Sequence, residues 1–341
     1  MDPELDSFLV TVYVVVDELY QAECAPHKPV RPGARPALSD SEVLTLGVLA
    51  QWQQRRSERE FLRRARPVLA PYFTHWLSQS AFNRRLRDLS GVLAYLTPRI
   101  AARTAEVVGP RAYQVLDGVP VPLMRRGRGQ RQRCFTTEAA IGRGGSDKDW
   151  FYGQRLLLSV DAHGSITGAV SGPANTEERW LAEALFSRRV DPAAPNPTAE
   201  ELAPVLGPAH RRGGHRQGPT GSLSLRLAAG AWGAEPYLGD QGYRGTNWRT
   251  HWQGDLGATV LLKSDYPPGP GRSWFAGLRQ VVETVNGYLE EYVGLHFPRA
   301  RTAWGLQTRL AAKLLAANLA RYFNALHARP LFAALEFAWS S

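Results

Sequence analysis

The sequence has few cysteines and no long apolar run, and each absence excludes a class of protein. Its 341 residues include only Cys24 and Cys134, which are far apart in the chain. This argues against a disulfide framework and a cysteine-rich zinc site, and it fits a reducing cytosol. The longest apolar run, residues 8–16, is too short to cross a bilayer and follows acidic residues. We therefore expect neither a membrane span nor a signal peptide.

Acidic residues are fewer than basic residues. The chain carries 41 Lys and Arg against 31 Asp and Glu, a formal net charge of +10. An excess of this size favours polyanionic partners, and nucleic acid is the first of these. Hydrophobic residues make up 44% of the chain, enough to bury a substantial core, and the length suggests about two domains.

Residues 1–107 are predicted to form a helical N-terminal domain. Several segments have apolar residues at helical spacing, and residues 80–96 are expected to form one of these helices. Ser39 is followed three residues later by Glu42, which is the spacing of a capping box and predicts a helix start. No single helix stands out as one that would read DNA bases.

Residues 108–341 show a different pattern, in which short apolar strands alternate with helices. One strand contains Asp117, two more are joined through residues 161–164, and another ends at Asp240. This alternation predicts an α/β domain with a mixed sheet. Residues 125–133, about 191–222 and 264–272 are predicted to be loops, the second of them a Pro- and Gly-rich insertion.

Three carboxylates, considered as a set, indicate a metal site. Alone, Asp117 and Asp240 each read as turn residues beside glycine, and Glu283 reads as a solvated residue on a helix. A site for two divalent metals, however, needs several hard oxygen ligands that are held by separate rigid elements. Two strand carboxylates and one helix carboxylate supply such a set, so Asp117, Asp240 and Glu283 are candidate metal ligands.

Three blocks of sequence resemble the DDE transposases of bacterial insertion sequences. The blocks are YQVLDGVPV at 113–121, YLGDQGYRG at 237–245 and the long stretch at 281–322; residues 37–52 and 80–89 resemble the helical N-terminal region of one such group. The resemblance implies an RNase H-like mixed-sheet catalytic domain over residues 108–341 and a DNA-binding role for residues 1–107. It makes Asp117, Asp240 and Glu283 the catalytic triad, holding Mg²⁺ or, in its place, Mn²⁺.

The same resemblance implies a reaction and partners. Such an enzyme cleaves the phosphodiester at each transposon end and then uses the freed 3′-OH to attack target DNA. Its partners would be terminal inverted repeats and target DNA, bound by a homodimer on paired ends in the nucleoid region of the bacterial cytosol. Two alternatives are an RNase H-like nuclease that never joins strands, and a catalytically inactive DNA-binding protein derived from a transposase.

One signature of this family is incomplete here. Many members carry Tyr, Arg, Glu and Lys at fixed spacing around the final carboxylate. This chain has Arg279 at the arginine position, but Ala276 and Glu290 replace the tyrosine and the lysine. Arg299, Arg301 or Lys313 are candidates to make the phosphate contact of the missing lysine.

Clustered arginines are candidates for DNA contact, because guanidinium groups neutralise phosphates and release counterions. The candidates are Arg55, Arg56, Arg59, Arg63, Arg64, Arg84, Arg85, Arg125, Arg126, Arg128, Arg131, Arg133, Arg244, Arg279, Arg299 and Arg301. The alternative for the first cluster is ion pairing with Glu58 and Glu60 on one helix face. Trp248, Trp252, Trp274 and Trp304 are either core residues or platforms for unpaired bases.

Overall fold

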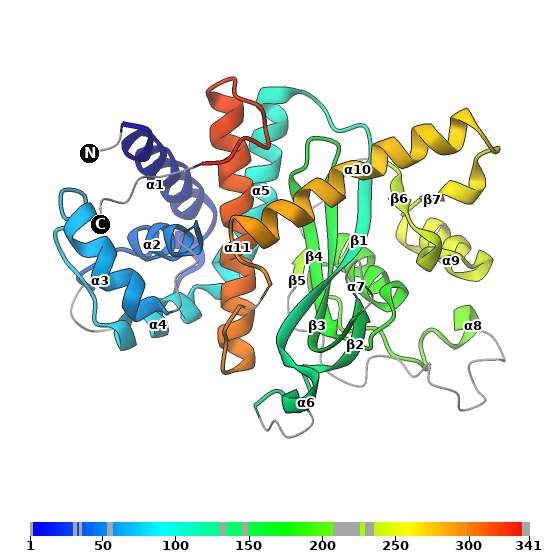
Figure 1. The fold of residues 1–341 in the computed structure, drawn as a ribbon, viewed down its shortest axis with the longest axis horizontal. Helices are drawn as coiled ribbons and strands as arrows, with labels where there is room; N and C mark the ends of the chain where they lie inside the picture. The colour runs from blue at the N-terminus through cyan, green and yellow to red at the C-terminus, as the bar shows by residue number, and fades with distance from the viewer. Residues whose placement is uncertain are drawn as a thin grey trace.

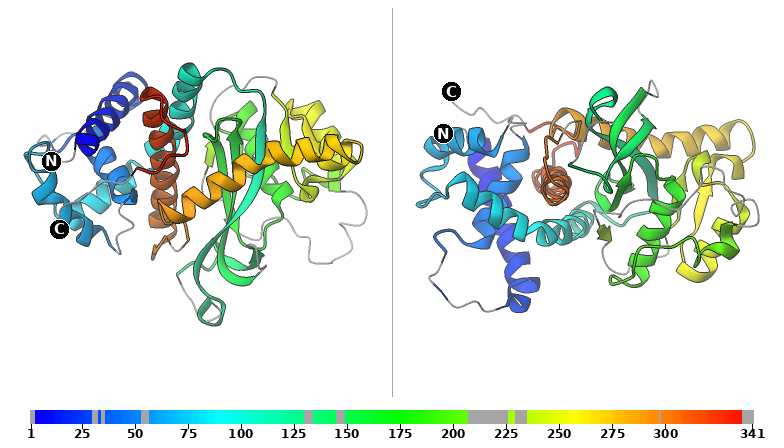
Figure 2. Two further views of the ribbon diagram at one scale, coloured as in Figure 1. Left: turned by 45° about the horizontal axis from the view of Figure 1, so that its top comes forward. Right: turned by 90° about the horizontal axis from the view of Figure 1, so that it is seen from below.

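The structure is a computed structural model that describes residues 3–29, 33, 36–52, 57–129, 134–144, 149–206, 226–228, 235–296 and 298–335. A group of N-terminal helices lies on one side and a mixed sheet on the other (Figure 1). Helix α11 (Ala303–Leu326) runs between them, and it is seen end-on in the right-hand view of Figure 2. One hydrophobic core extends from the N-terminal helices through α11 to the sheet.

The N-terminal part is helical, as predicted. It consists of α1 (Pro3–Glu23), the short 3-10 helix η1 (Ala25–His27), α2 (Asp40–Trp52), α3 (Glu58–Leu69), α4 (Gln79–Asp88) and α5 (Ser90–Val108). The predicted capping box precedes α2: the Glu42 amide donates to Ser39 Oγ at 3.1 Å, and the Ser39 amide donates to Glu42 Oε2 at 2.6 Å.

The prediction of one helix over residues 80–96 was wrong. The chain breaks at Leu89, where ψ is 7°, and this separates α4 from α5. The break turns two apolar faces toward different neighbours, so that Phe82 and Leu86 of α4 and Leu93 and Leu96 of α5 are all buried.

Within the described residues, seven strands form one mixed sheet. They are β1 (Gln114–Arg125), β2 (Ala140–Gly144), β3 (Asp149–Asp161), β4 (Ile166–Pro173), β5 (Arg226–Ala228), β6 (Tyr237–Gly239) and β7 (Val260–Leu262). The order is β5-β4-β3-β1-β6-β7, with β2 paired to β3. The pairs from β5 to β1 are antiparallel, whereas β1, β6 and β7 are parallel to one another.

Side chains alternate between the two faces of the sheet, and each face is covered by helices. Leu116 and Leu157 pack with α7 (Glu178–Val190) and α9 (Thr246–Leu256) in one cluster. Val115 and Val119 point the other way, into the larger core that includes α11. This alternation puts Asp117 on the same face as Val115 and Val119.

Helix α10 (Pro270–Glu291) crosses the sheet over β1 (Figure 1). One face of this helix is apolar, with Phe275, Val282, Val285 and Leu289 all buried. The predicted loop at 264–272 was too long, because the 3-10 helix η4 (Lys263–Asp265) occupies its start and α10 already begins at Pro270. Proline suits the first turn of a helix, where its missing N–H is not needed.

The other two predicted loops are only partly described. Arg125 ends β1 and residues Arg126–Gly129 form the short helix α6, so the first part of the predicted 125–133 loop was wrong. The described part of the insertion includes α8 (Ala203–Leu206), and residues 207–222 lie outside the described chain. A domain boundary at 107/108 stays a prediction. Among the described helices, none is both long and apolar enough to cross a membrane.

Candidate active site

The parallel pairing of β1 and β6 places Asp117 and Asp240 at the same level of two adjacent inner strands. Val115 lies opposite Leu238 in this pair. Each aspartate comes two residues later in its own strand direction, so the two carboxylates leave the pair at the same level. Asp117 lies within the long strand β1, so it is not a turn residue. Asp240 follows β6 and caps the 3-10 helix η3 (Gln241–Tyr243), where its Oδ1 accepts from the Gly242 amide at 2.7 Å.

Helix α10 contributes the third predicted carboxylate. Arg279, Glu283 and Asn286 are four and three residues apart, so they share one face of the helix. That face meets β1: Asn286 Nδ2 donates to Asp117 Oδ2 at 2.8 Å, and Arg279 Nη2 lies 3.5 Å from Asp117 Oδ1. Arg279, predicted to contact DNA, is therefore engaged with Asp117.

The charges of these residues act on one another. Burial raises the pKa of Asp117, and the negative charges of Asp240 and Glu283 raise it further. Arg279 and the hydrogen bond from Asn286 oppose this rise because both favour the ionised form. Asp117 thus contacts α10 through Arg279 and Asn286, and the charges of Asp240 and of the exposed Glu283 act on it.

A fourth carboxylate, Glu178, also belongs to this group, and the sequence analysis missed it. Glu178 stands in the first turn of α7, on the opposite side of Gly118 from α10. A β-carbon on Gly118 would lie 2.5 Å from Glu178 Oε1. One on Gly242 would lie 2.8 Å from Asp240 Oδ1 and 3.2 Å from Glu178 Oε2. Both glycines therefore leave room for carboxylates, which is a use of glycine that a turn interpretation does not reveal.

Glu178 and Tyr243 have strongly perturbed acidities. Burial raises the pKa of Glu178 to about 7; Asp240 and Asp117 add to the rise, whereas Arg155, whose Nη1 is 3.5 Å from Glu178 Oε1, lowers it. Burial and the neighbouring carboxylates also raise the pKa of Tyr243 well above its usual range. The buried Tyr243 hydroxyl has no hydrogen-bond partner among the described residues.

The donor set fits a hard divalent cation. Carboxylate oxygens are the ligands that Mg²⁺ prefers, and a cation here would favour the ionised form of Asp117, whose pKa burial and, to a smaller extent, the neighbouring carboxylates raise. Asn286 Oδ1 and the Tyr243 hydroxyl are further oxygen atoms with no partner in the described chain. As they stand, no three His, Cys, Asp or Glu side chains of the described residues are close enough together to hold a metal ion.

The predicted DNA-contact arginines fall into three groups. Those whose side chains are exposed are Arg59, Arg63, Arg64, Arg84, Arg244, Arg299 and Arg301. Arg55, Arg56, Arg131 and Arg133 lie outside the described residues, and so do the side chains of Arg125, Arg126 and Arg128. Arg279 and Arg85 are partly buried and bound to aspartates.

Some of these arginines have structural partners. Arg85 Nη2 lies 2.6 Å from Asp40 Oδ1, a largely buried carboxylate, which gives this arginine a role inside the helical part. The predicted pairing of Glu58 and Glu60 with neighbouring arginines is half right. Glu60 lies 3.6 Å from Arg64, but Glu58 pairs with Arg309 of α11.

The four tryptophans are divided between core and surface. Trp248 and Trp252 are buried against α7, which leaves no face for a base. Trp274 and Trp304 are 56% and 50% exposed. Trp304 Nε1 donates to the Arg87 carbonyl at 3.0 Å, so it attaches the start of α11 to α4.

Comparison with known proteins adds no further assignment to this geometry. No protein-family model, no curated protein and no solved structure matches the chain.

Proposed function

We propose that the chain is a metal-dependent DNA transposase of the DDE type, with an RNase H-like catalytic domain over residues 108–341. The main support is that Asp117 of β1 and Asp240 after β6 stand at one level of two adjacent parallel strands, and that the α10 face carrying Glu283 meets Asp117. Burial is the largest cause of the raised pKa of Asp117, and the charges of Asp240 and Glu283 add to it. A mixed sheet with carboxylates at two adjacent parallel strands is consistent with this fold.

The residues around the triad have separate tasks in this proposal. Asp117, Asp240 and Glu283 would hold Mg²⁺, or Mn²⁺ in its place. When bound, divalent cations supply activation of the attacking oxygen and stabilisation of the leaving oxygen in phosphodiester chemistry. Arg279 and Asn286 would hold Asp117 in place and oppose the rise in its pKa that burial causes, because both interactions favour its charged form.

The same proposal covers partners and location. The net charge of +10 and the exposed arginines suit the polyanionic backbone of terminal repeats and target DNA. Binding of two transposon ends implies a homodimer, and the reaction takes place in the bacterial cytosol.

A strand-transfer assay tests this function. The substrates are a DNA end with a labelled 3′-OH and a supercoiled plasmid, incubated with Mg²⁺. We expect labelled joined products with the native chain and none with Asp117→Asn, Asp240→Asn or Glu283→Gln. Glu291→Gln, an exposed change on the same helix, is the matched control and should retain activity.

Two other outcomes would support the alternatives. Cleavage of the DNA end without joining would identify a nuclease of the same fold. DNA binding with neither cleavage nor joining would identify a catalytically inactive relative. Unchanged activity in all three triad variants would exclude this site.

A further inference from the structure

A basic trough lies between the N-terminal helices and the start of α11. It consists of an inner pocket of about 180 Å³ and an outer hollow of about 680 Å³ that share Gln51, Glu58, Arg299 and Arg309 as walls. Glu290 of α10 lines the inner pocket. It is seven residues beyond Glu283, two helical turns away on nearly the same face, or about 10 Å along the axis. The inner pocket therefore reaches α10 about two turns beyond Glu283.

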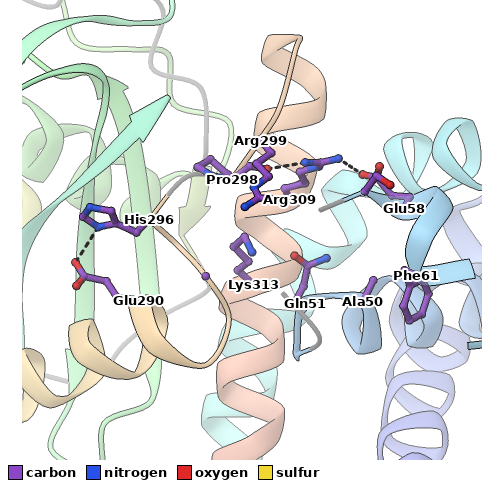
Figure 3. A pocket seen from close by; sticks show the side chains of 12 residues that line it. Ala50, Gln51, Glu58, Phe61, Glu290, His296, Pro298, Arg299, Arg309 and Lys313 are labelled. Carbon is purple, nitrogen blue, oxygen red and sulfur yellow. Dashed lines mark hydrogen bonds and ion pairs between the residues drawn. The ribbon is translucent and has the colours of Figure 1, made fainter. Parts of the chain in front are cut away.

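Cations converge in the inner pocket (Figure 3). Lys313 is 6% exposed, and its Nζ donates to the Val293 carbonyl. Arg309 donates to the Pro298 carbonyl at 2.6 Å and pairs with Glu58. Arg299 has no ion-pair partner among the described residues. The two acids of the pocket, Glu58 and Glu290, lie beside Arg309 and His296, so Arg299 is the exposed cation that no described acid compensates.

Arg299 also has an unusual backbone conformation. Its φ is 56°, a region that residues with large side chains rarely adopt. Such strain persists where the surrounding structure enforces it, and it is often found at functional sites. Here it places an exposed guanidinium at the wall shared by the inner pocket and the outer hollow.

The outer hollow is lined by the polar face of α4. Gln79, Asn83 and Arg87 form one wall, and Arg301 and Thr302 stand on the other. Arg84 lines a shallower extension of the same face. Asparagine and glutamine amides can bond two edge atoms of adenine, and arginine can do the same with guanine. This face therefore has the groups that read bases, opposite groups that bind phosphates.

We propose that the trough binds duplex DNA: Arg299 and Arg301 contact the phosphate backbone, and Gln79 and Asn83 of α4 read base edges. The proposal rests on the proposed function for the identity of the polyanion, since the charge alone specifies only a polyanion. In this proposal α4 is the recognition helix. Residues 298–309 bind the DNA backbone on the opposite side of the trough.

Binding without catalysis tests the trough separately from the active site. Fluorescence anisotropy would be measured on short duplexes with a randomised centre, in EDTA, over a series of salt concentrations. We expect Arg299→Ala combined with Arg301→Ala to weaken binding and to lower the salt slope by about 0.9 for each phosphate that the variant no longer neutralises. Lys263→Ala, an exposed change on η4 at the far end of the sheet, should leave both quantities unchanged.

Sequencing of the duplexes selected by each variant tests base reading. Asn83→Ala should relax selection at one position, by about tenfold, with the salt slope unchanged. Selection and salt slope that match the native chain in all trough variants would overturn the proposal, and so would equal binding of single strands. If the trough variants still carry out strand transfer, the proposed function stands although the trough proposal has failed. Loss of strand transfer in the triad variants alone would show that the two sites are separate.

Discussion

Glu178 fills the space in which a side chain on Gly118 would begin. The carboxylate Oε1 lies 2.5 Å from the position of a β-carbon on that glycine. Gly118 follows Asp117 directly, so the absence of a side chain on one face of β1 allows Glu178 to approach, while Asp117 on the other face meets α10. Because Gly118 has no side chain, Glu178 on one face of the sheet can lie close to Asp117 on the other face.

Gly118→Ala should consequently impair the site more than the fold. The clashing atom is the end of a flexible side chain, so the protein can accommodate the methyl group by moving Glu178 away from Asp240. We expect Mg²⁺-dependent DNA cleavage to fall about tenfold or more, equivalent to ~1.4 kcal/mol in the barrier. The melting temperature should change by no more than a few degrees.

Gly254→Ala in α9 is the control for that change, because a β-carbon there meets nothing within 4 Å. Both variants would be compared by thermal unfolding and by cleavage rate at saturating Mg²⁺. A Gly118→Ala protein that cleaves DNA at the native rate would show that the position of Glu178 is unimportant for the reaction.

Asn286 favours the ionised form of Asp117. Its side chain donates a hydrogen bond to Asp117 at 2.8 Å, and this bond lowers a pKa that burial has raised. Asn286→Ala removes the bond, so the pKa of Asp117 should rise further. Because Asp117 must be ionised to hold a cation, the acid limb of the pH profile for cleavage should move to higher pH.

Thr284→Ala is the matched control for Asn286→Ala. Thr284 is exposed on the same helix and its hydroxyl bonds only to the Gln280 carbonyl. Its pH profile should overlay that of the native chain. An Asn286→Ala profile that is lower at every pH but has the same midpoint would show that Asn286 positions groups without affecting this ionisation.

The predicted elements and the triad were accessible from the sequence for a physical reason. Asp117 and Asp240 each follow a short apolar run, and strands of one sheet place such positions at one level. Glu283 lies beside an apolar stripe whose spacing already indicates which side of α10 faces the core. Local pattern therefore marked these residues as candidate ligands, and the resemblance to the DDE transposases grouped them as a triad.

Glu178 could not be selected in the same way. It adjoins Glu177 at the start of a helix, and neither residue has a pattern that distinguishes it. Only the packing of α7 on the sheet and the close approach at Gly118 give Glu178 its place. The trough could not be predicted from the sequence either, because residues that line it, such as Arg309 and Glu58, are far apart in the chain and come into contact only in the folded protein.

Asn318 should be essential to the fold around α11. It is fully buried, and its amide donates to the carbonyls of Thr97 and Ile166 and accepts from the Ile166 amide, each at 2.8 Å. Asn318→Leu would leave the buried Ile166 amide and carbonyl unpaired, at roughly 1–3 kcal/mol each, whereas the Thr97 carbonyl keeps its bond within α5. We expect the free energy of unfolding in urea to fall by about 2 kcal/mol or more. Gln280→Leu, an exposed change on α10, is the control and should alter the free energy of unfolding little. A small loss of stability in Asn318→Leu would mean that α11 relaxes so that the backbone groups find other partners.

Lys313 should give the protein a pH-dependent stability. Burial lowers its pKa from 10.5 to about 7, and the charges of Arg309 and Arg299 add to this effect. Between those two values the unfolded chain holds a proton that the folded chain has lost, so stability should rise with pH across this window, by up to about 1.4 kcal/mol per unit. Below pH 7 the buried charge remains and the stabilisation is absent.

Lys313→Met removes this titration and tests its sign. The variant should be most stable relative to the native chain below pH 7, and that difference should shrink steadily as the pH rises toward 10.5. Urea unfolding followed by tryptophan fluorescence at several pH values gives the difference directly. Lys263→Met, which alters an exposed lysine, should differ from the native chain by the same amount at every pH. If Lys313→Met behaves like this control, the Lys313 ammonium keeps its ordinary pKa, which requires that water or an anion reaches it within the inner pocket.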